Sequence, residues 1–162
     1  MVGEHFSATD LAPYHASEEA ETAVDAAVAA GLLAEVPGGF AFTHGTVRAA
    51  VVDSLGPLRR QHLHADIARS LIDRFGASPD HAIEIAEHVL AAGDWPDQAE
   101  AAAIFERAGD AAMSRFSWAR GLRFFEAVLA LPGYVESLGR REQGHLFARA
   151  ARASGVNGDR DR

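Results

Sequence analysis

A histidine and an arginine stand at the start of a predicted helix, at a position that favours an anion. The segment Phe40-Ala-Phe-Thr alternates as a short strand does, and it leads into a helix that begins at His44 and carries Arg48 one turn later. The first N–H groups of a helix lack intrahelical acceptors and lie at the positive end of its dipole, which suits a phosphate. His44 therefore either caps this helix or contacts a nucleotide that another domain holds.

Two other kinds of chemistry have weaker support in the sequence. His81, Glu84 and His88 share one face of a predicted helix and could ligate a metal, but no clear closed set of ligands accompanies them. Serine–histidine catalysis lacks a Gly-x-Ser-x-Gly elbow. We therefore expect no catalytic residue, no metal site and no cofactor held by this chain alone.

The composition indicates an acidic, globular chain. Of its 162 residues, 48% are hydrophobic and 23% are charged, which is ordinary for a soluble domain, and the net charge is −8. This charge disfavours non-specific binding to nucleic acid or to an anionic membrane. Cysteine is absent, which excludes disulfides, thiolate zinc sites and cysteine nucleophiles. No apolar run approaches the roughly 20 residues of a membrane span, so a cytoplasmic location is the default expectation.

The first 56 residues are predicted to form a truncated winged-helix unit. A helix starts at Ser17, with acids in its first turn, and Gly31 ends it. The segments 32–36 and 40–42 then predict a β-hairpin, which would be the wing. A short preceding helix is expected at 9–12, and the first helix of such a fold is missing.

The rest of the chain is predicted to be helical. Residues 57–78 form a connecting amphipathic helix with an apolar stripe at four-residue steps, and Ser78 caps the helix that follows, with Pro79 at its first position. Residues 79–154 form an antiparallel array of paired helices, and residues 155–162 form a disordered tail. The stripe consists of Leu63, Ile67, Leu71 and Phe75, and the expected helices of the array end at 93, 115, 131 and 153.

One tetratricopeptide-like repeat can be placed between residues 102 and 135. Large, small and apolar residues alternate there as that repeat requires, although Ala112 and Val128 depart from its usual pattern. We expect the aromatic residues of this region to form the core between the helices. Because Phe124 and Phe125 are adjacent, both cannot face inward equally, so Phe124 is a candidate for contact with a partner protein. Trp118 is a second candidate. The matching positions are Phe105, Gly109, Trp118, Gly121, Phe125 and Leu129, and the expected aromatic core also includes Phe116.

The segments together resemble a known family. Three segments are similar to the region that follows the nucleotide-binding domain in STAND-type P-loop regulatory ATPases: Phe40 to Arg48, Ser54-Leu-Gly-Pro-Leu-Arg-Arg60, and Leu63-His64-Ala-Asp-Ile-Ala68. Two more, Ile85-Ala-Glu-His88-Val-Leu-Ala-Ala-Gly-Asp94 and Arg107-Ala-Gly-Asp110, resemble the helical repeats that follow there. Such ATPases include the large ATP-binding regulators of the LuxR type in bacteria and the ATPases joined to adenylate cyclases. No Walker A loop, Walker B acid or effector domain is present, so the resemblance implies a middle piece, or a truncated product, of such a protein.

The resemblance also implies a mechanism and partners. The winged-helix unit would fold over ADP bound in a P-loop domain of the same protein, with His44 approaching the diphosphate and Arg48 supporting it. The helical-repeat arm would sense an inducer or a protein and release that inactive state. The chain would thus be a non-catalytic regulatory segment that couples the two. The fold class expected is mainly α: a truncated winged helix with one β-hairpin, then a tetratricopeptide-like array.

Two alternatives remain open. The chain could be a freestanding helical-repeat adaptor in which the hairpin is only a cap. It could also be a winged-helix DNA-binding protein, but the candidate recognition helix, 17–30, contains four carboxylates and no cation. Because DNA affinity depends on cations that neutralise phosphates, we expect this helix to be repelled by DNA.

Overall fold

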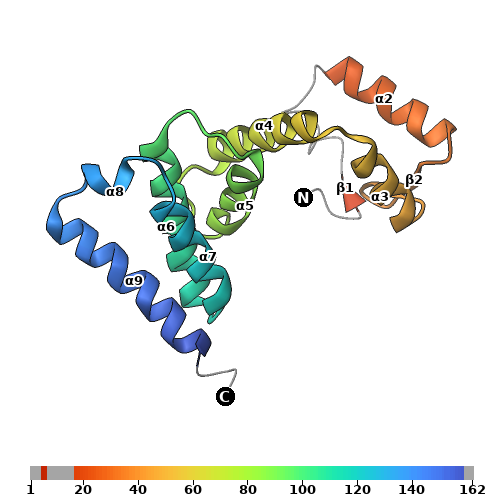
Figure 1. Cartoon of the computed structure of the whole chain (residues 1–162). Coiled ribbons are helices and arrows are strands. Elements are labelled where there is room, and N and C mark those ends of the chain that lie inside the picture. The colour runs from red at the N-terminus through yellow and green to blue at the C-terminus, as the bar shows by residue number, and fades with distance from the viewer. Residues whose placement is uncertain (1–4, 7–16, 159–162) are drawn as a thin grey trace. The chain divides into compact units, whose positions relative to one another are not determined.

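The structure is mainly α-helical with one small antiparallel sheet, which confirms the predicted fold class (Figure 1). It is a computed structural model in which residues 5–6 and 17–158 are described. The chain divides into two compact units, Met1–Ser70 and Leu71–Arg162. The division lies inside helix α4, Pro57–Phe75, and so splits the predicted connecting segment. None of the described helices is both long and apolar enough to cross a membrane.

The sheet of the first unit contains the predicted hairpin and one further strand. Strands β2, Leu33–Val36, and β3, Gly39–Phe42, pair antiparallel around a two-residue turn, Pro37-Gly38. Gly38 has φ +89°, as the third residue of a type II turn requires, and proline favours the position before it. Strand β1, His5–Phe6, pairs with the other edge of β3, so the order is β1-β3-β2. This third strand is absent from the sequence prediction.

Helix α2, Ser17–Ala29, packs on this sheet and ends as its sequence predicts. Gly31 has φ +71°, and the N–H groups of Gly31 and Leu32 donate to the carbonyls of Val28 and Ala27, both at 2.9 Å. These bonds form a Schellman motif, which glycine favours because it lacks a Cβ. A small apolar cluster joins the helix to the sheet. It contains Phe6, Val24 and Leu33, with Phe40 and Phe42 packed against it. The short helix expected at 9–12 lies outside the described residues.

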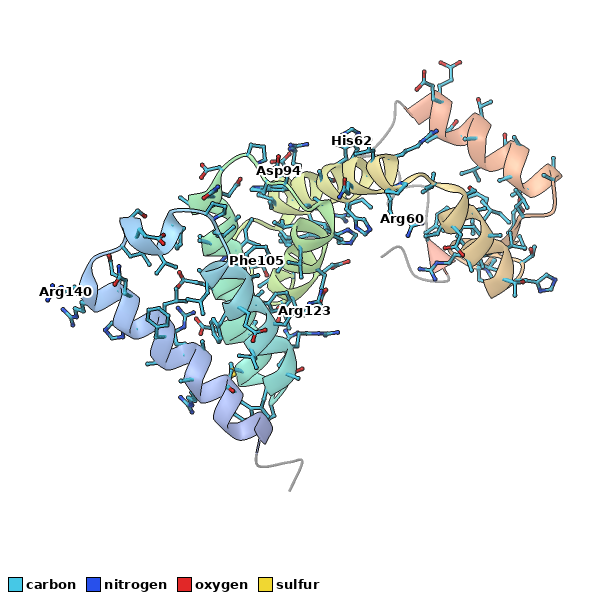
Figure 2. All side chains as sticks on the ribbon, viewed as in Figure 1. Arg60, His62, Asp94, Phe105, Arg123 and Arg140 are labelled. Atoms are coloured by element: carbon cyan, nitrogen blue, oxygen red, sulfur yellow. The ribbon has the colours of Figure 1, made fainter. Side chains whose placement is uncertain are left out.

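Helices α3, Gly45–Ser54, and α4 are joined by an arginine cap. The Arg60 side chain (Figure 2) donates from Nη2 to the carbonyl of Val52 at 2.9 Å and lies 4.0 Å from the Asp53 carboxylate. An arginine suits the negative end of a helix dipole. The apolar stripe predicted for α4 is only partly correct. Leu63 is 43% exposed, whereas Ala68 is fully buried.

The second unit is a series of antiparallel helices in which α5 packs on α6, α6 on α7, and α7 on α9 (Figure 1). Asp97 caps α6 and accepts hydrogen bonds from the backbone N–H groups of Ala99 and Glu100 at 2.9 and 3.0 Å. Gly93, with φ +82°, ends α5 where the sequence predicts. The helices are α5 Ala82–Ala92, α6 Gln98–Ser114, α7 Trp118–Leu129, α8 Tyr134–Ser137 and α9 Arg140–Gly158.

Three boundaries of this unit differ from the prediction. Ser78 does not cap α5, because residues 79–81 form a turn and the N-cap is His81, whose ring stacks on Phe75 at 3.6 Å. The single helix expected at 136–153 is divided into α8 and α9 near Gly139. Residues 155–158, which the sequence assigns to a disordered tail, form the end of α9.

Two glycines let α6 and α7 approach closely. A Cβ added to Gly109 would lie 2.5 Å from Phe125 Cε1, and one added to Gly121 would lie 3.0 Å from the Met113 side chain. Phe125 is fully buried, so its ring has little freedom to move away. The small residues predicted at these two positions are therefore required by the packing.

We expect Gly109→Ala to destabilise the protein although alanine favours helix. The added methyl group would overlap the Phe125 ring, and overpacking costs about 1–3 kcal/mol, against about 1 kcal/mol gained from helix propensity. Gly144→Ala in α9 is the matched control, because a Cβ there meets nothing within 4 Å. The control should stabilise by up to about 1 kcal/mol. Urea unfolding of both variants measures the difference, and equal effects of the two would contradict this packing.

Candidate functional site

His44 occupies the N-cap position of α3 without using its side chain as a cap. Its backbone is extended, with φ −145° and ψ 142°, and its carbonyl accepts from the N–H of Val47 at 3.0 Å. The imidazole is exposed and makes no capping hydrogen bond to the described residues. Arg48, one turn along, is half-buried. His44 is thus the N-cap residue, which is one of its two expected roles, but it caps through its backbone alone, and the imidazole is accessible for another contact.

Helix α3 itself is poorly covered. Within its ten residues, all of which the structure describes, none is buried, and Val51 and Val52 are 41% and 38% exposed. Most helical stability in proteins comes from packing of an apolar face, and an isolated helix of this length is marginal in water. The valines of α3 thus form a surface that a further body could cover.

The histidines considered for metal binding do not come together. His81 Nδ1 lies 3.5 Å from the Glu84 carboxylate, but its ring is stacked on Phe75. His88 is buried within α5. Among the residues that the structure describes, no three His, Cys, Asp or Glu side chains are placed to hold a metal ion.

The aromatic residues of the second unit differ from the prediction at two positions. Phe124 and Phe125 are both fully buried, so the expectation that Phe124 faces a partner is wrong. The two rings can both be inward because α7 lies between two neighbouring helices, α6 and α9. Phe116, expected in the core, is 74% exposed and lies edge-on to Trp118 with 5.9 Å between ring centroids. Trp118 is half-buried, so it keeps the accessible surface that a contact residue needs.

Phe116 is also held in an unfavourable backbone conformation. It has φ +58°, and it takes the position that glycine favours in the Schellman motif that ends α6. The N–H of Phe116 donates to Met113 at 3.1 Å and that of Ser117 to Ala112 at 2.9 Å. A bulky residue in the left-handed region costs about 1–2 kcal/mol. Neither burial nor backbone preference explains phenylalanine here, so Phe116 is a candidate contact residue.

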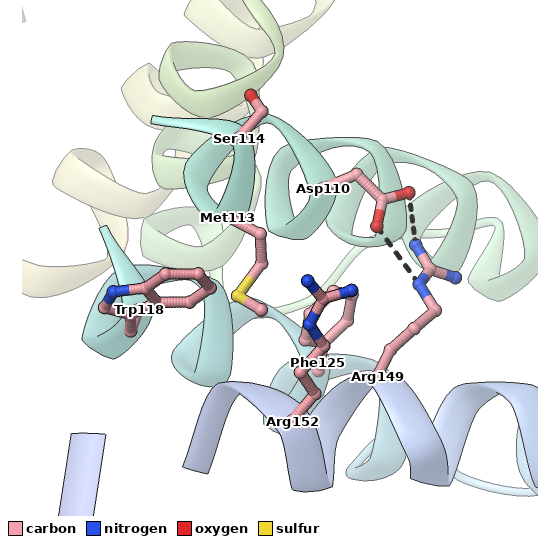
Figure 3. Close-up of a pocket in the computed structure, with 7 residues that line it drawn as sticks. All are labelled: Asp110, Met113, Ser114, Trp118, Phe125, Arg149 and Arg152. Carbon is pink, nitrogen blue, oxygen red and sulfur yellow. Dashed lines mark hydrogen bonds and ion pairs between the residues drawn. The ribbon is translucent and has the colours of Figure 1, made fainter. Parts of the chain in front are cut away.

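A cavity of about 240 Å³ opens beside Trp118 (Figure 3). Its wall is formed by the end of α6, the start of α7 and the second half of α9. The side chains that line it are Asp110, Met113, Ser114, Trp118, Phe125, Arg149 and Arg152.

Arg149 fixes one side of the cavity. Its guanidinium donates to the Asp110 carboxylate at 2.6 and 3.1 Å and to Glu106 Oε2 at 2.5 Å, and it lies 4.8 Å from the centre of the Phe125 ring. Burial lowers the pKa of Arg149, but its hydrogen bonds to Asp110 and Glu106 outweigh that effect and raise the pKa above its ordinary value. Arg149 therefore stays charged and joins α9 to α6.

Arg152 gives the cavity a different kind of charge. It is exposed, and it forms no ion pair with a residue that the structure describes. The cavity thus combines an apolar wall, formed by Trp118 and Met113, with the cation of Arg152 and the Ser114 hydroxyl. This combination suits an apolar side chain that neighbours a carboxylate. Local sequence patterns do not indicate Arg149, because it acts through residues of another helix, and they do not indicate Arg152, because only the cavity distinguishes it from other exposed arginines.

Comparison of the chain with protein-family models, with curated proteins and with solved structures returned no match. The function is therefore inferred from the chain's own residues.

Replacing Arg149 should destabilise the second unit more than replacing its neighbour Arg152. We expect Arg149→Lys to cost about 1–2 kcal/mol, because lysine cannot make the paired hydrogen bonds to Asp110 and still reach Glu106. Arg152→Lys, the control, should change stability by less than about 0.5 kcal/mol. Urea unfolding midpoints test this, and equal losses would show that the Arg149 ion pairs are no more than exposed surface pairs.

Proposed function

We propose that the chain is a non-catalytic regulatory segment that couples a P-loop nucleotide-binding domain to a helical-repeat arm, as in regulatory ATPases of the STAND type. The resemblance of residues 40–68 to the segment that follows such a domain first suggests this function. The first unit contacts the nucleotide-binding domain, and the second receives the inducer or protein partner.

The observation that carries this proposal is the incomplete burial of α3. A ten-residue helix with no buried residue and two exposed valines contributes little to the stability of its own unit. Apolar surface of this kind is stabilised when a second body covers it. A domain docked on α3 would cover Val51 and Val52 and would lie beside His44.

The position of His44 suits contact with the phosphates of a nucleotide held by that domain. The imidazole is exposed at the positive end of α3, and its backbone is already in the extended conformation of an N-cap. The first N–H groups of α3 add donors for an anion. ADP in the partner domain would thus link the two bodies, with Arg48 one turn further along.

The helical array supplies the second function. Half-buried Trp118 and exposed Arg152 border one cavity at the junction of three helices, and exposed Phe116 lies edge-on to Trp118. A ligand or protein that binds there contacts α6, α7 and α9 together. Such binding would favour one arrangement of these helices and so provide a signal to the rest of the protein.

Direct DNA binding has less support than this reading. Glu18, Glu19, Glu21 and Asp25 are all exposed on α2, and the turn of the hairpin carries no charge. A helix with this charge is repelled by the phosphates of DNA. A salt-sensitive shift of duplex DNA by the chain alone would overturn this view.

Hydrogen exchange should distinguish α3 from the helices of the array. In the chain alone, amides of α3 should exchange with protection close to that of an unfolded peptide, because no buried residue holds the helix. Amides of α6, whose core positions are buried, should be the most protected. Protection in α3 equal to that in α6 would show that α3 is already stabilised without a partner domain.

In the protein that contains the nucleotide-binding domain, His44→Ala should weaken ADP retention by about tenfold, as expected for a hydrogen bond to a charged group. His62→Ala is the control, because His62 is also exposed but lies on α4. The ADP dissociation rate of both variants is the measurement. Unchanged retention in His44→Ala would remove His44 from the site, and a neighbouring domain without a Gly-x-x-x-x-Gly-Lys-Ser/Thr loop would contradict the proposal as a whole.

A further inference from the structure

Helices α5 and α7 are copies of one pattern. The run Ile85-Ala-Glu-His-Val-Leu-Ala in α5 matches Phe124-Phe-Glu-Ala-Val-Leu-Ala in α7, 39 residues later. The positions of the buried residues repeat together with the sequence. Ile85 and Phe124 are both buried, and so are Ala86 and Phe125, which are followed by Val89 and Val128. The second unit therefore contains two helices of the same kind, each packed against α6.

Helices α6 and α9 form a second matching pair. The run Ile104-Phe-Glu-Arg-Ala-Gly-Asp-Ala-Ala in α6 matches Leu146-Phe-Ala-Arg-Ala-Ala-Arg-Ala-Ser in α9, 42 residues later. Ile104 and Leu146 are each 2% exposed. Leu146 is buried where α9 packs on α7. The array thus alternates between two helix types in the order α5, α6, α7 and α9.

Helices α6 and α9 differ in the burial of one face, which in α6 is the face that α7 covers. Phe105 of α6 is 4% exposed, whereas its equivalent in α9, Phe147, is 51% exposed. Three further positions behave in the same way, being buried in α6 and exposed in α9. They are Ala102, Gly109 and Ala112 in α6, and Gly144, Ala151 and Ser154 in α9. We call the four α9 residues Gly144, Phe147, Ala151 and Ser154 the outer face of α9.

The contact between α6 and α7 shows what fits such a face. The Phe125 ring of α7 lies directly over Gly109, so a large apolar side chain sits where α6 has its smallest residue. Ala151 is the equivalent position of α9, and because it carries the methyl group that Gly109 lacks, a helix on this face would lie slightly further from α9 than α7 lies from α6. Gly144 is exposed, and a Cβ added there meets no atom within 4 Å, so no described residue crowds this end of the face. A helix with the pattern of α7 would therefore find an apolar face of the right kind.

Charge gives a second, independent requirement. Glu87 of α5 pairs with Arg123 and Arg120 of α7, at 2.7 and 3.5 Å. The equivalent of Glu87 in α7 is Glu126, which is exposed and forms no ion pair with a described residue. A helix with the same pattern would carry arginines two and five residues before its large apolar residue, as Arg123 and Arg120 precede Phe125, and these would reach Glu126 as Arg123 reaches Glu87.

We propose that the outer face of α9 binds an amphipathic helix of a partner protein, antiparallel to α9, with a large apolar residue over Ala151 and arginines paired with Glu126. A second copy of this chain is a poorer occupant, because the matching faces of its α5 and α7 are already buried. The inference goes beyond the proposed function, since neither α3 nor His44 takes part. The test of the α9 face can therefore fail while the proposed function stands, and the proposed function can fail while the α9 face still binds a helix.

The probe is a fluorescent peptide with the sequence of residues 117–131, which carries Arg120, Arg123, Phe124 and Phe125. Fluorescence anisotropy should show saturable binding to the full chain. Ala151→Arg should weaken binding by at least about tenfold, because it places a long charged side chain under the large apolar residue. Ala23→Arg, which puts the same change at an exposed alanine of α2, is the matched control and should leave binding unchanged.

The arginine contact has its own test. Glu126→Gln should weaken binding of the peptide by about threefold, as a surface ion pair allows. The same variant should have no effect on a peptide that carries Arg120→Gln and Arg123→Gln, as a double-mutant cycle requires. Glu136→Gln on α8 is the control for loss of one exposed carboxylate.

Three results would overturn the proposal. The first is no binding of the peptide at millimolar concentration. The second is equal binding by Ala151→Arg with its thermal unfolding unchanged, which would mean that the peptide binds elsewhere or replaces α7. The third is a dimer of the chain alone that Ala151→Arg dissociates, measured by sedimentation equilibrium, because the face would then belong to a second copy.

Discussion

The close contact between Gly109 and Phe125 is the constraint on which the second unit depends. Because Gly109 has no side chain, the Phe125 ring lies against the α6 backbone. In the same contact, Gly121 of α7 lets the Met113 side chain of α6 approach closely. With this spacing Phe124 and Phe125 are both fully buried. Phe125 in turn supports the Arg149 guanidinium, which pairs with Asp110 and so holds α9 on α6. The cavity at the end of α6 is a consequence of the same contacts.

Local signals in the sequence predicted most of the fold. Gly31, Gly93 and the Pro37-Gly38 turn each act through a few neighbouring residues, and the structure confirms all three. The misses involve partners distant in sequence. Strand β1 pairs with β3, which lies more than thirty residues away, and no local pattern marks a strand of two residues. Ser78 had the right type for a cap, but the stacking of His81 on Phe75 moved the start of α5.

The candidate site was predictable only in part, for the same physical reason. His44 is placed by a strand-to-helix junction that the sequence shows directly, whereas Arg149 acts through carboxylates 39 and 43 residues away. Phe124 was assigned to the surface because one helix face cannot hold two adjacent rings. A helix between two neighbours buries both. The internal repeat was readable in the sequence, since Ile85 to Ala91 matches Phe124 to Ala130. Its functional meaning required burial, because sequence alone does not show that Phe147 is exposed where Phe105 is covered.

Three features of this molecule lower the stability of the isolated chain. Helix α3 has no buried residue, Phe116 occupies a left-handed conformation that glycine would tolerate, and Phe147 exposes a ring that its equivalent in α6 buries. Each lowers the stability of the chain relative to a simple replacement, namely a polar residue or a glycine. An interaction that covers these residues would recover that free energy, which is consistent with the proposed contacts to a partner domain and a partner helix. The three features lie on separate elements, namely α3, the turn between α6 and α7, and α9, so more than one contact would be needed to cover them.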